Sequence, residues 1–231
     1  MLMFELKGKL AHFRRPDTMV THATYPFIPR TVLRGLLASV LGLPKLTGEN
    51  LTGIRLLSPL RTCTQELSML GKGWLGGGGD SFNRPTSIEL VINPHYLIYY
   101  HGEHLERLCE LIKERRSYYH TYLGSAFCLT FPRFVDLTEG SPLSHPLPEK
   151  LECRSVLPSH TVEGLIPQDK TRYARVGGMH YDYLGERCFE GTINLIYDMG
   201  GRPISFSPRK AENGHPYKFV RLQEGEVICL W

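Results

Sequence analysis

The change of hydrophobic period between the first two patterned segments constrains the fold most. In the opening MLMFELKGKL, apolar residues occupy every second position, which is typical of a strand with one buried face. The run PRTVLRGLLASVLGL follows, and its apolar residues repeat at helical spacing. Pro29 suits the first helical position, and Gly42 suits the position after the last turn, with Pro44 close behind. The sequence therefore predicts a strand followed by a buried helix.

The later patterns extend this order. Strand-like runs begin at Ile54 and continue to Cys63 and beyond, and recur in TSIELVI and YLIYYHG. An amphipathic helix is predicted from Glu103 to Arg116, and a further strand from Phe127 to Val135. The resulting order, β-α-β-β-α-β, predicts an α+β fold with a ferredoxin-like (RRM-like) arrangement.

Two irregular segments interrupt this order. The glycine-rich stretch GKGWLGGGGD predicts the tip of an inserted β-hairpin, here called the thumb, near residues 61–85. The proline-rich stretch from Ser141 to Lys150 predicts a connection between two parts of the chain. We therefore expect a first domain over residues 1–140 and a smaller, β-rich segment over 141–231.

Composition limits the function classes without selecting one. A formal charge of +4 permits a nucleic-acid partner but does not require one. The cysteines are scattered without a CxxC pair, which favours reduced thiols and a cytoplasmic protein. The opening residues lack the pattern of a signal peptide, and no apolar stretch approaches the length of a membrane span.

Small-molecule and metal chemistry find little support. The loop GKGWLG matches the glycine spacing of a dinucleotide fingerprint, but the glycines that follow it preclude the required helix. His101 and His104 have an HxxH spacing without a third ligand at a recognisable position, so two surface histidines are the simpler interpretation. We predict neither a cofactor nor a metal.

Two arginines at the start of the first helix raise the question of a ligand. Arg30 and Arg34 lie where the helix dipole disfavours cations, at a cost of roughly 0.3–1 kcal/mol each. A bound phosphate would reverse that balance, whereas the alternative is that both side chains extend to solvent. Other side chains that precede the helix and extend this basic patch are Arg14, Arg15, His22 and Tyr25.

Two further groups of residues are candidates for RNA contacts. Lys72 and Trp74 at the glycine-rich tip suit backbone approach and base stacking, although a mobile loop explains them equally well. The segment after the second helix carries Tyr118, Tyr119 and His120, close in sequence to Arg115 and Arg116. They suit RNA stacking, the general acid–base chemistry of a metal-independent ribonuclease, or simple packing at a core edge.

Four of these segments together resemble a known family. FELKGKLAHFRRP, TYPFIPRTVLRGLLASVLGL, INPHYLIYY and YYHTYLGSAFCLT are similar to segments of the CRISPR-associated Cas-five family, which belongs to the RAMP superfamily. The resemblance covers about the first 135 residues. Members of this family are subunits of type I Cascade, an antiviral surveillance complex, in which they cap the 5′ handle of the CRISPR RNA (crRNA).

The resemblance implies roles for the candidate residues. Arg30 and Arg34 would hold phosphates of the 5′ handle, and Lys72 and Trp74 would belong to a thumb that wedges against the guide RNA. The implied partners are the crRNA, the terminal backbone subunit and the large subunit of Cascade, with target DNA met through the complex.

One branch of this family cuts precursor CRISPR RNA, using tyrosine, lysine and histidine. Here the residue before His120 is Tyr119 rather than a lysine. The opening FRRP and the first helix are also more similar to the non-cutting branch. We therefore predict a non-catalytic, I-B-like RNA-binding subunit. The alternative is a metal-independent endoribonuclease.

Overall fold

The computed structural model describes residues 1–18, 20–72, 81–144, 146–209 and 216–231 of the chain. Its α+β class confirms the prediction: two α-helices accompany sheets whose paired strands are antiparallel. The first half contains β1 (Leu2–Lys7), β2 (Leu10–Ala11), α1 (Arg30–Leu41), β3 (Asn50–Leu56), β4 (Thr62–Lys72), β5 (Ser81–Ile92), β6 (His95–Gly102), α2 (Leu105–Lys113) and β7 (Arg133–Leu137).

The second half consists of short strands and one long hairpin. Its elements are β8 (Gly140–Pro142), β9 (Leu151–Cys153), β10 (Leu157–Pro158), the 3-10 helix η2 (Ser159–Thr161), β11 (Val162–Leu165), β12 (Tyr173–Gly185), β13 (Cys188–Asp198), β14 (Ile204–Pro208), β15 (Lys218–Leu222) and β16 (Val227–Leu230). Among the described residues, no helix is both long enough and apolar enough to cross a bilayer.

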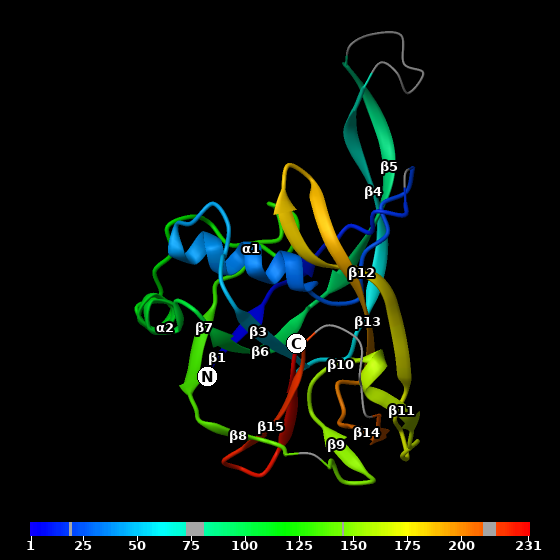
Figure 1. Cartoon of the computed structure of the whole chain (residues 1–231). Coiled ribbons are helices and arrows are strands. Elements are labelled where there is room, and N and C mark those ends of the chain that lie inside the picture. The colour runs from blue at the N-terminus through cyan, green and yellow to red at the C-terminus, as the bar shows by residue number, and fades with distance from the viewer. Residues whose placement is uncertain (19, 73–80, 145, 210–215) are drawn as a thin grey trace.

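A four-stranded sheet with the order β3-β6-β1-β7 organises the molecule. Both helices lie on one side of it (Figure 1). The period-two pattern of β1 explains this arrangement, because Phe4 and its partner Ile98 belong to the core that includes the helices. Met3 and its partner Tyr99 belong instead to a second cluster, which contains residues of β15 and β16. The sheet is therefore covered on both faces at its central strands, whereas the edge strand β7 is mostly exposed.

The C-terminal residues extend this packing to the edge strand β3. The backbone groups of Thr52 and Trp231 exchange two hydrogen bonds, of 3.0 and 2.9 Å, and the Trp231 side chain is fully buried. One hydrophobic cluster contains residues from both sides of the expected boundary at residue 140. That boundary itself stays a prediction.

Strands β4 and β5 form a long antiparallel hairpin that projects from the rest of the chain (Figure 1). It lies between β3 and β6 in the chain, where the sequence predicted an inserted hairpin. Its pairing extends as far as Lys72 opposite Ser81, and residues 73–80, including Trp74, lie outside the described residues.

Three predicted boundaries were wrong, each for a local reason. The strand predicted from Ile54 onward is two strands, separated by a segment that contains Pro59. The strand predicted from Phe127 begins only at Arg133, because Pro132 has no N–H to continue a ladder. The second helix is shorter than predicted at both ends, where His104 and Arg115 adopt positive φ.

The boundaries of α1 follow its sequence closely. Pro29 was predicted at the first helical position. It has an extended backbone instead and occupies the N-cap position, and the helix begins at Arg30. Gly42 ends the helix with a φ of 75°, as its predicted position after the last turn requires. A Cβ atom at Gly42 would lie only 2.7 Å from Cγ of Tyr118, so this position needs glycine for space as well as for conformation.

We predict that Gly42→Ala lowers the free energy of unfolding by about 2 kcal/mol, because the left-handed backbone and the Tyr118 ring both oppose a side chain. The matched control is Gly35→Ala in the same helix, where an added Cβ meets nothing within 4 Å. That variant should gain about 0.5–1 kcal/mol from helix propensity. Urea unfolding followed by circular dichroism measures both, and equal effects would contradict the assignment.

Candidate nucleic-acid interface

Arg30 connects helix α1 to the central sheet. Its guanidinium group donates 2.9 and 3.0 Å hydrogen bonds to the backbone carbonyls of Trp231 and Asn50, and it lies over the Tyr181 ring at 4.7 Å. The residue is only 4% exposed. Desolvation accordingly lowers the pKa of Arg30 from its ordinary value. This side chain holds together α1, β3, β12 and the last residue of the chain.

Arg34, one turn later, connects the same helix to the β12–β13 hairpin. Its guanidinium donates to the Asp182 carboxylate at 2.5 Å and to the Leu46 carbonyl at 2.7 Å, and the residue is 8% exposed. Burial alone would raise the pKa of Asp182. The hydrogen bonds from Arg34 and the Tyr183 backbone and the positive charges of Arg34 and Arg30 outweigh burial and lower this pKa.

The structure thus gives both arginines protein partners. The sequence predicts either a phosphate or solvent at these guanidinium groups, whereas Arg30 and Arg34 are buried against backbone carbonyls and a carboxylate. Their predicted contact with RNA stays a prediction. In this conformation, their interactions fix the β12–β13 hairpin beside α1 (Figure 1).

A groove of about 530 Å³ lies where this hairpin, the start of α1 and the base of the β4–β5 hairpin meet. Three of the predicted RNA-binding residues line it: Arg14, His22 and Tyr25. The other lining residues are His12, Phe13, Pro16, Pro29, Thr31, Val32, Met69, Ile88, Gly124, Ser125, Phe127, His180 and Phe189.

The loop that carries the predicted residues is tied to strand β5. The His22 backbone exchanges hydrogen bonds with Ser87 and Glu89, both at 2.9 Å, and the Glu89 carboxylate accepts a 3.0 Å bond from the Thr24 N–H. Tyr25 is buried, and its hydroxyl donates to the Gly178 carbonyl of β12 at 3.1 Å. The groove is therefore a fixed feature, assembled from distant parts of the sequence.

Arg14 is the cation best placed to meet an anion in this groove. It is exposed, and its only hydrogen bond among the described residues is a 3.3 Å contact to the Thr18 carbonyl. Arg15, by contrast, forms an ion pair of 2.6 Å with Asp17. Desolvation lowers the pKa of His22, and the nearby charges of Arg14, His12 and Arg84 lower it further. His22 is therefore a neutral aromatic ring at neutral pH.

His12 is a groove residue that sequence reasoning missed. Its Nδ1 lies 2.8 Å from the Glu89 carbonyl, which can only accept, so Nδ1 carries the proton. Its buried Nε2 has no partner among the described residues, and its ring stacks on His22 with the centroids 6.2 Å apart. No spacing rule distinguishes His12 from other polar loop residues in a single sequence.

The remaining predicted residues lie elsewhere. Tyr118, Tyr119 and His120 are exposed on the segment after α2 and do not line the groove. Lys72 ends strand β4, and Trp74 lies outside the described residues. The structure therefore brings together the candidates at the base of the β4–β5 hairpin and separates them from the tyrosine-rich segment.

We predict that Asp182→Asn lowers the free energy of unfolding at pH 7 by about 1–2 kcal/mol, because the Arg34 guanidinium loses its charged partner. The pKa of Asp182 is lower in the folded chain than the ordinary value of about 3.9. Its contribution is therefore complete above about pH 4 and is lost as the pH falls through the folded pKa.

The matched control is Asp136→Asn. Asp136 accepts a hydrogen bond from the N–H of the next residue, as Asp182 does, but has no ion pair among the described residues. Chemical unfolding between pH 2 and pH 7 should show a reduced acid dependence for Asp182→Asn alone. The same acid dependence in wild type and Asp182→Asn would contradict a stabilising ion pair.

Comparison with known proteins places this fold among CRISPR-associated proteins. A chain from a structure described as a CRISPR RNA-guided surveillance complex aligns with a TM-score of 0.50 and 14% identity, covering 92% of this chain and 93% of that one. A crystal structure of a Cas protein aligns with a TM-score of 0.50 and 17% identity, covering 87% and 95%. These likenesses concern the fold alone.

A third structure, of a CRISPR-associated protein, aligns with a TM-score of 0.40 and 16% identity over 58% of this chain and 66% of that one. No curated protein matches the sequence significantly. Residues 1–60 match the family model described as CRISPR-associated protein (Cas_Cas5). These residues include all of α1 and the groove residues Arg14, His22 and Tyr25. Over these residues, the chain is similar to the CRISPR-associated Cas5 family.

Proposed function

We propose that the chain is a non-catalytic, crRNA-binding subunit of a type I surveillance complex of the I-B-like kind, and that it caps the 5′ handle. The match of residues 1–60 to the Cas5 family model and the fold shared with a chain of an RNA-guided surveillance complex support this role. The observation that carries it is the groove, in which Arg14 has no ion pair with any residue that the structure describes and is accompanied by imidazole and aromatic rings.

The groove suits a single strand of RNA. The Arg14 guanidinium can bind a phosphate, and the rings of His22, Phe127 and Phe189 present faces on which unpaired bases stack. Phe189 is itself stacked on His180 at 4.1 Å. Positive charge for the backbone and aromatic rings for the bases are the two components of most single-strand binding surfaces.

The fold offers a platform for this role. The elements β1-α1-β3-β6-α2-β7 and the antiparallel strand order β3-β6-β1-β7 support a ferredoxin-like interpretation. On this interpretation the β4–β5 hairpin is the thumb, and its base forms one wall of the groove. The partners are the crRNA, the terminal backbone subunit and the large subunit, in the cytoplasm, with target DNA reached through the complex.

The first test is binding of labelled repeat RNA by the purified protein in EDTA, with binding and cleavage read on one gel. Arg14→Ala should weaken binding about tenfold, which corresponds to about 1.4 kcal/mol. It should also reduce the salt dependence by about 0.7 in log–log slope, because one phosphate contact is lost. Arg221→Ala, which removes an exposed arginine of β15, is the matched control and should change neither quantity.

His22→Ala should weaken binding at pH 7.5 without changing the salt slope, because the lowered pKa leaves this ring uncharged. Binding by wild type that neither groove variant weakens would contradict the groove as the RNA site. A discrete cut that His120→Ala abolishes would instead establish the alternative, a metal-independent endoribonuclease.

A further inference from the structure

The segment between Ser117 and Pro132 contains no lysine, arginine, aspartate or glutamate, although most of it lies on the surface. Its large side chains form an apolar patch, which we define as Tyr118, Tyr119, Tyr122, Phe127, Leu129 and Phe131. All six are exposed, and Phe127, Leu129 and Phe131 have exposed fractions of 57, 53 and 67%. Large apolar side chains that gather on the surface of a soluble protein mark interaction sites.

Local structure holds the apolar patch in place. Buried Cys128 and Thr130 alternate with Phe127, Leu129 and Phe131, whose side chains are exposed. The Thr130 hydroxyl donates to the Lys7 carbonyl at 2.9 Å, and the Thr130 carbonyl accepts from the Thr121 hydroxyl at 2.5 Å. A preordered surface loses little conformational entropy on binding.

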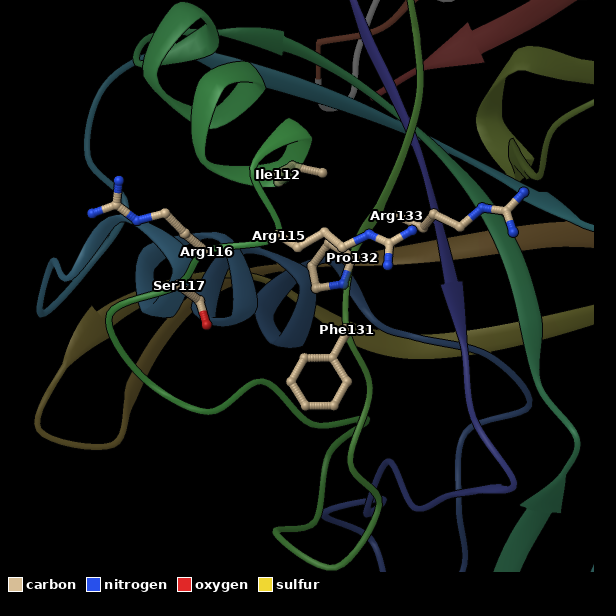
Figure 2. A pocket seen from close by; sticks show the side chains of 7 residues that line it. All are labelled: Ile112, Arg115, Arg116, Ser117, Phe131, Pro132 and Arg133. Atoms are coloured by element: carbon tan, nitrogen blue, oxygen red, sulfur yellow. The ribbon is translucent and has the colours of Figure 1, made fainter.

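Arginines border one end of the apolar patch. A pocket of about 380 Å³ is lined by Phe131, Pro132 and the arginines at positions 115, 116 and 133. Figure 2 shows Arg115 and Arg133 extending away from Arg116, with the Phe131 ring below Pro132. The Arg115 side chain has no hydrogen-bond or ion-pair partner among the described residues. Among the described residues, Arg116 pairs with exposed Glu114 at 3.0 Å, and Arg133 pairs with half-buried Glu5 at 3.6 Å.

We propose that the apolar patch is a docking surface for another protein subunit, which presents apolar side chains bordered by at least one carboxylate. Aromatic side chains and arginines are the residues enriched at the centres of protein interfaces. A free guanidinium beside Phe131 provides the charge complement for an acidic side chain. This inference rests on the proposed function, because the partner is a protein of the same surveillance complex.

RNA fits the apolar patch less well than a protein does. Strands of RNA need cations along the phosphate path, and the patch has none between Arg116 and Arg133. Leu129, in the middle of the exposed row, has no aromatic face on which a base can stack. The cations and rings of the groove form a separate site, to which Phe127 alone of the patch contributes.

The test places a photo-crosslinking residue, p-benzoylphenylalanine, at position 129 of the full chain. The chain is co-expressed with crRNA and with the CRISPR-associated proteins encoded beside it, and the purified complex is irradiated. The matched control carries the same residue in place of Leu165, an exposed leucine of β11. We expect a crosslink to a protein subunit from position 129 and at least a tenfold weaker one from position 165.

A second variant, Leu129→Asp with Phe131→Asp, separates the proposals. It should bind repeat RNA in isolation as wild type does, melt at the same temperature, and enter the complex at least tenfold less. Crosslinks to RNA alone, no crosslink in a complex that has formed, or normal incorporation of the double variant would each overturn the docking surface while leaving the proposed function intact. Failure of the wild type both to bind RNA and to enter any complex would overturn both proposals.

Discussion

Two buried guanidinium groups on one helix face determine how the parts of this chain meet. Arg30 satisfies backbone carbonyls at the edge of the central sheet and at Trp231, and Arg34 pairs with Asp182 on the long hairpin. Buried cations are costly unless their hydrogen bonds are made. Because each arginine requires partners from several elements at once, only an arrangement that brings α1, β3 and β12 together satisfies both.

The groove is a consequence of that arrangement. The β12–β13 hairpin contributes His180 and Phe189 to one wall because Asp182 is held against α1. The opposite wall comes from the loop containing Arg14 and His22, which is bonded to strand β5. Arg30 and Arg34, which the sequence suggested as phosphate ligands, thus position the groove. Arg14, which has no ion pair within the described part of the chain, carries the proposed contact.

The parts of the fold that local chemistry determines could be predicted from the sequence. The first strand and the end of α1 at Gly42 follow from the hydrophobic period and the residues that end each element. The partners of Arg30 and Arg34 could not be predicted, because Trp231 and Asp182 lie 201 and 148 residues away in sequence. For the same reason, His12 gave no signal: its importance depends on a carbonyl of β5 and on a groove formed by distant segments.

The wide sequence separation of the residues that line the groove also determines when the groove forms during folding. Its lining residues extend from His12 to Phe189, so an N-terminal fragment that ends before the β12–β13 hairpin lacks one wall. Contacts between such distant residues form only after the intervening loops have closed, which makes them late events in folding. During synthesis, the growing chain would therefore expose α1 and the first strands well before it offered a complete groove. Any ligand of this groove would thus select chains whose folding is nearly finished.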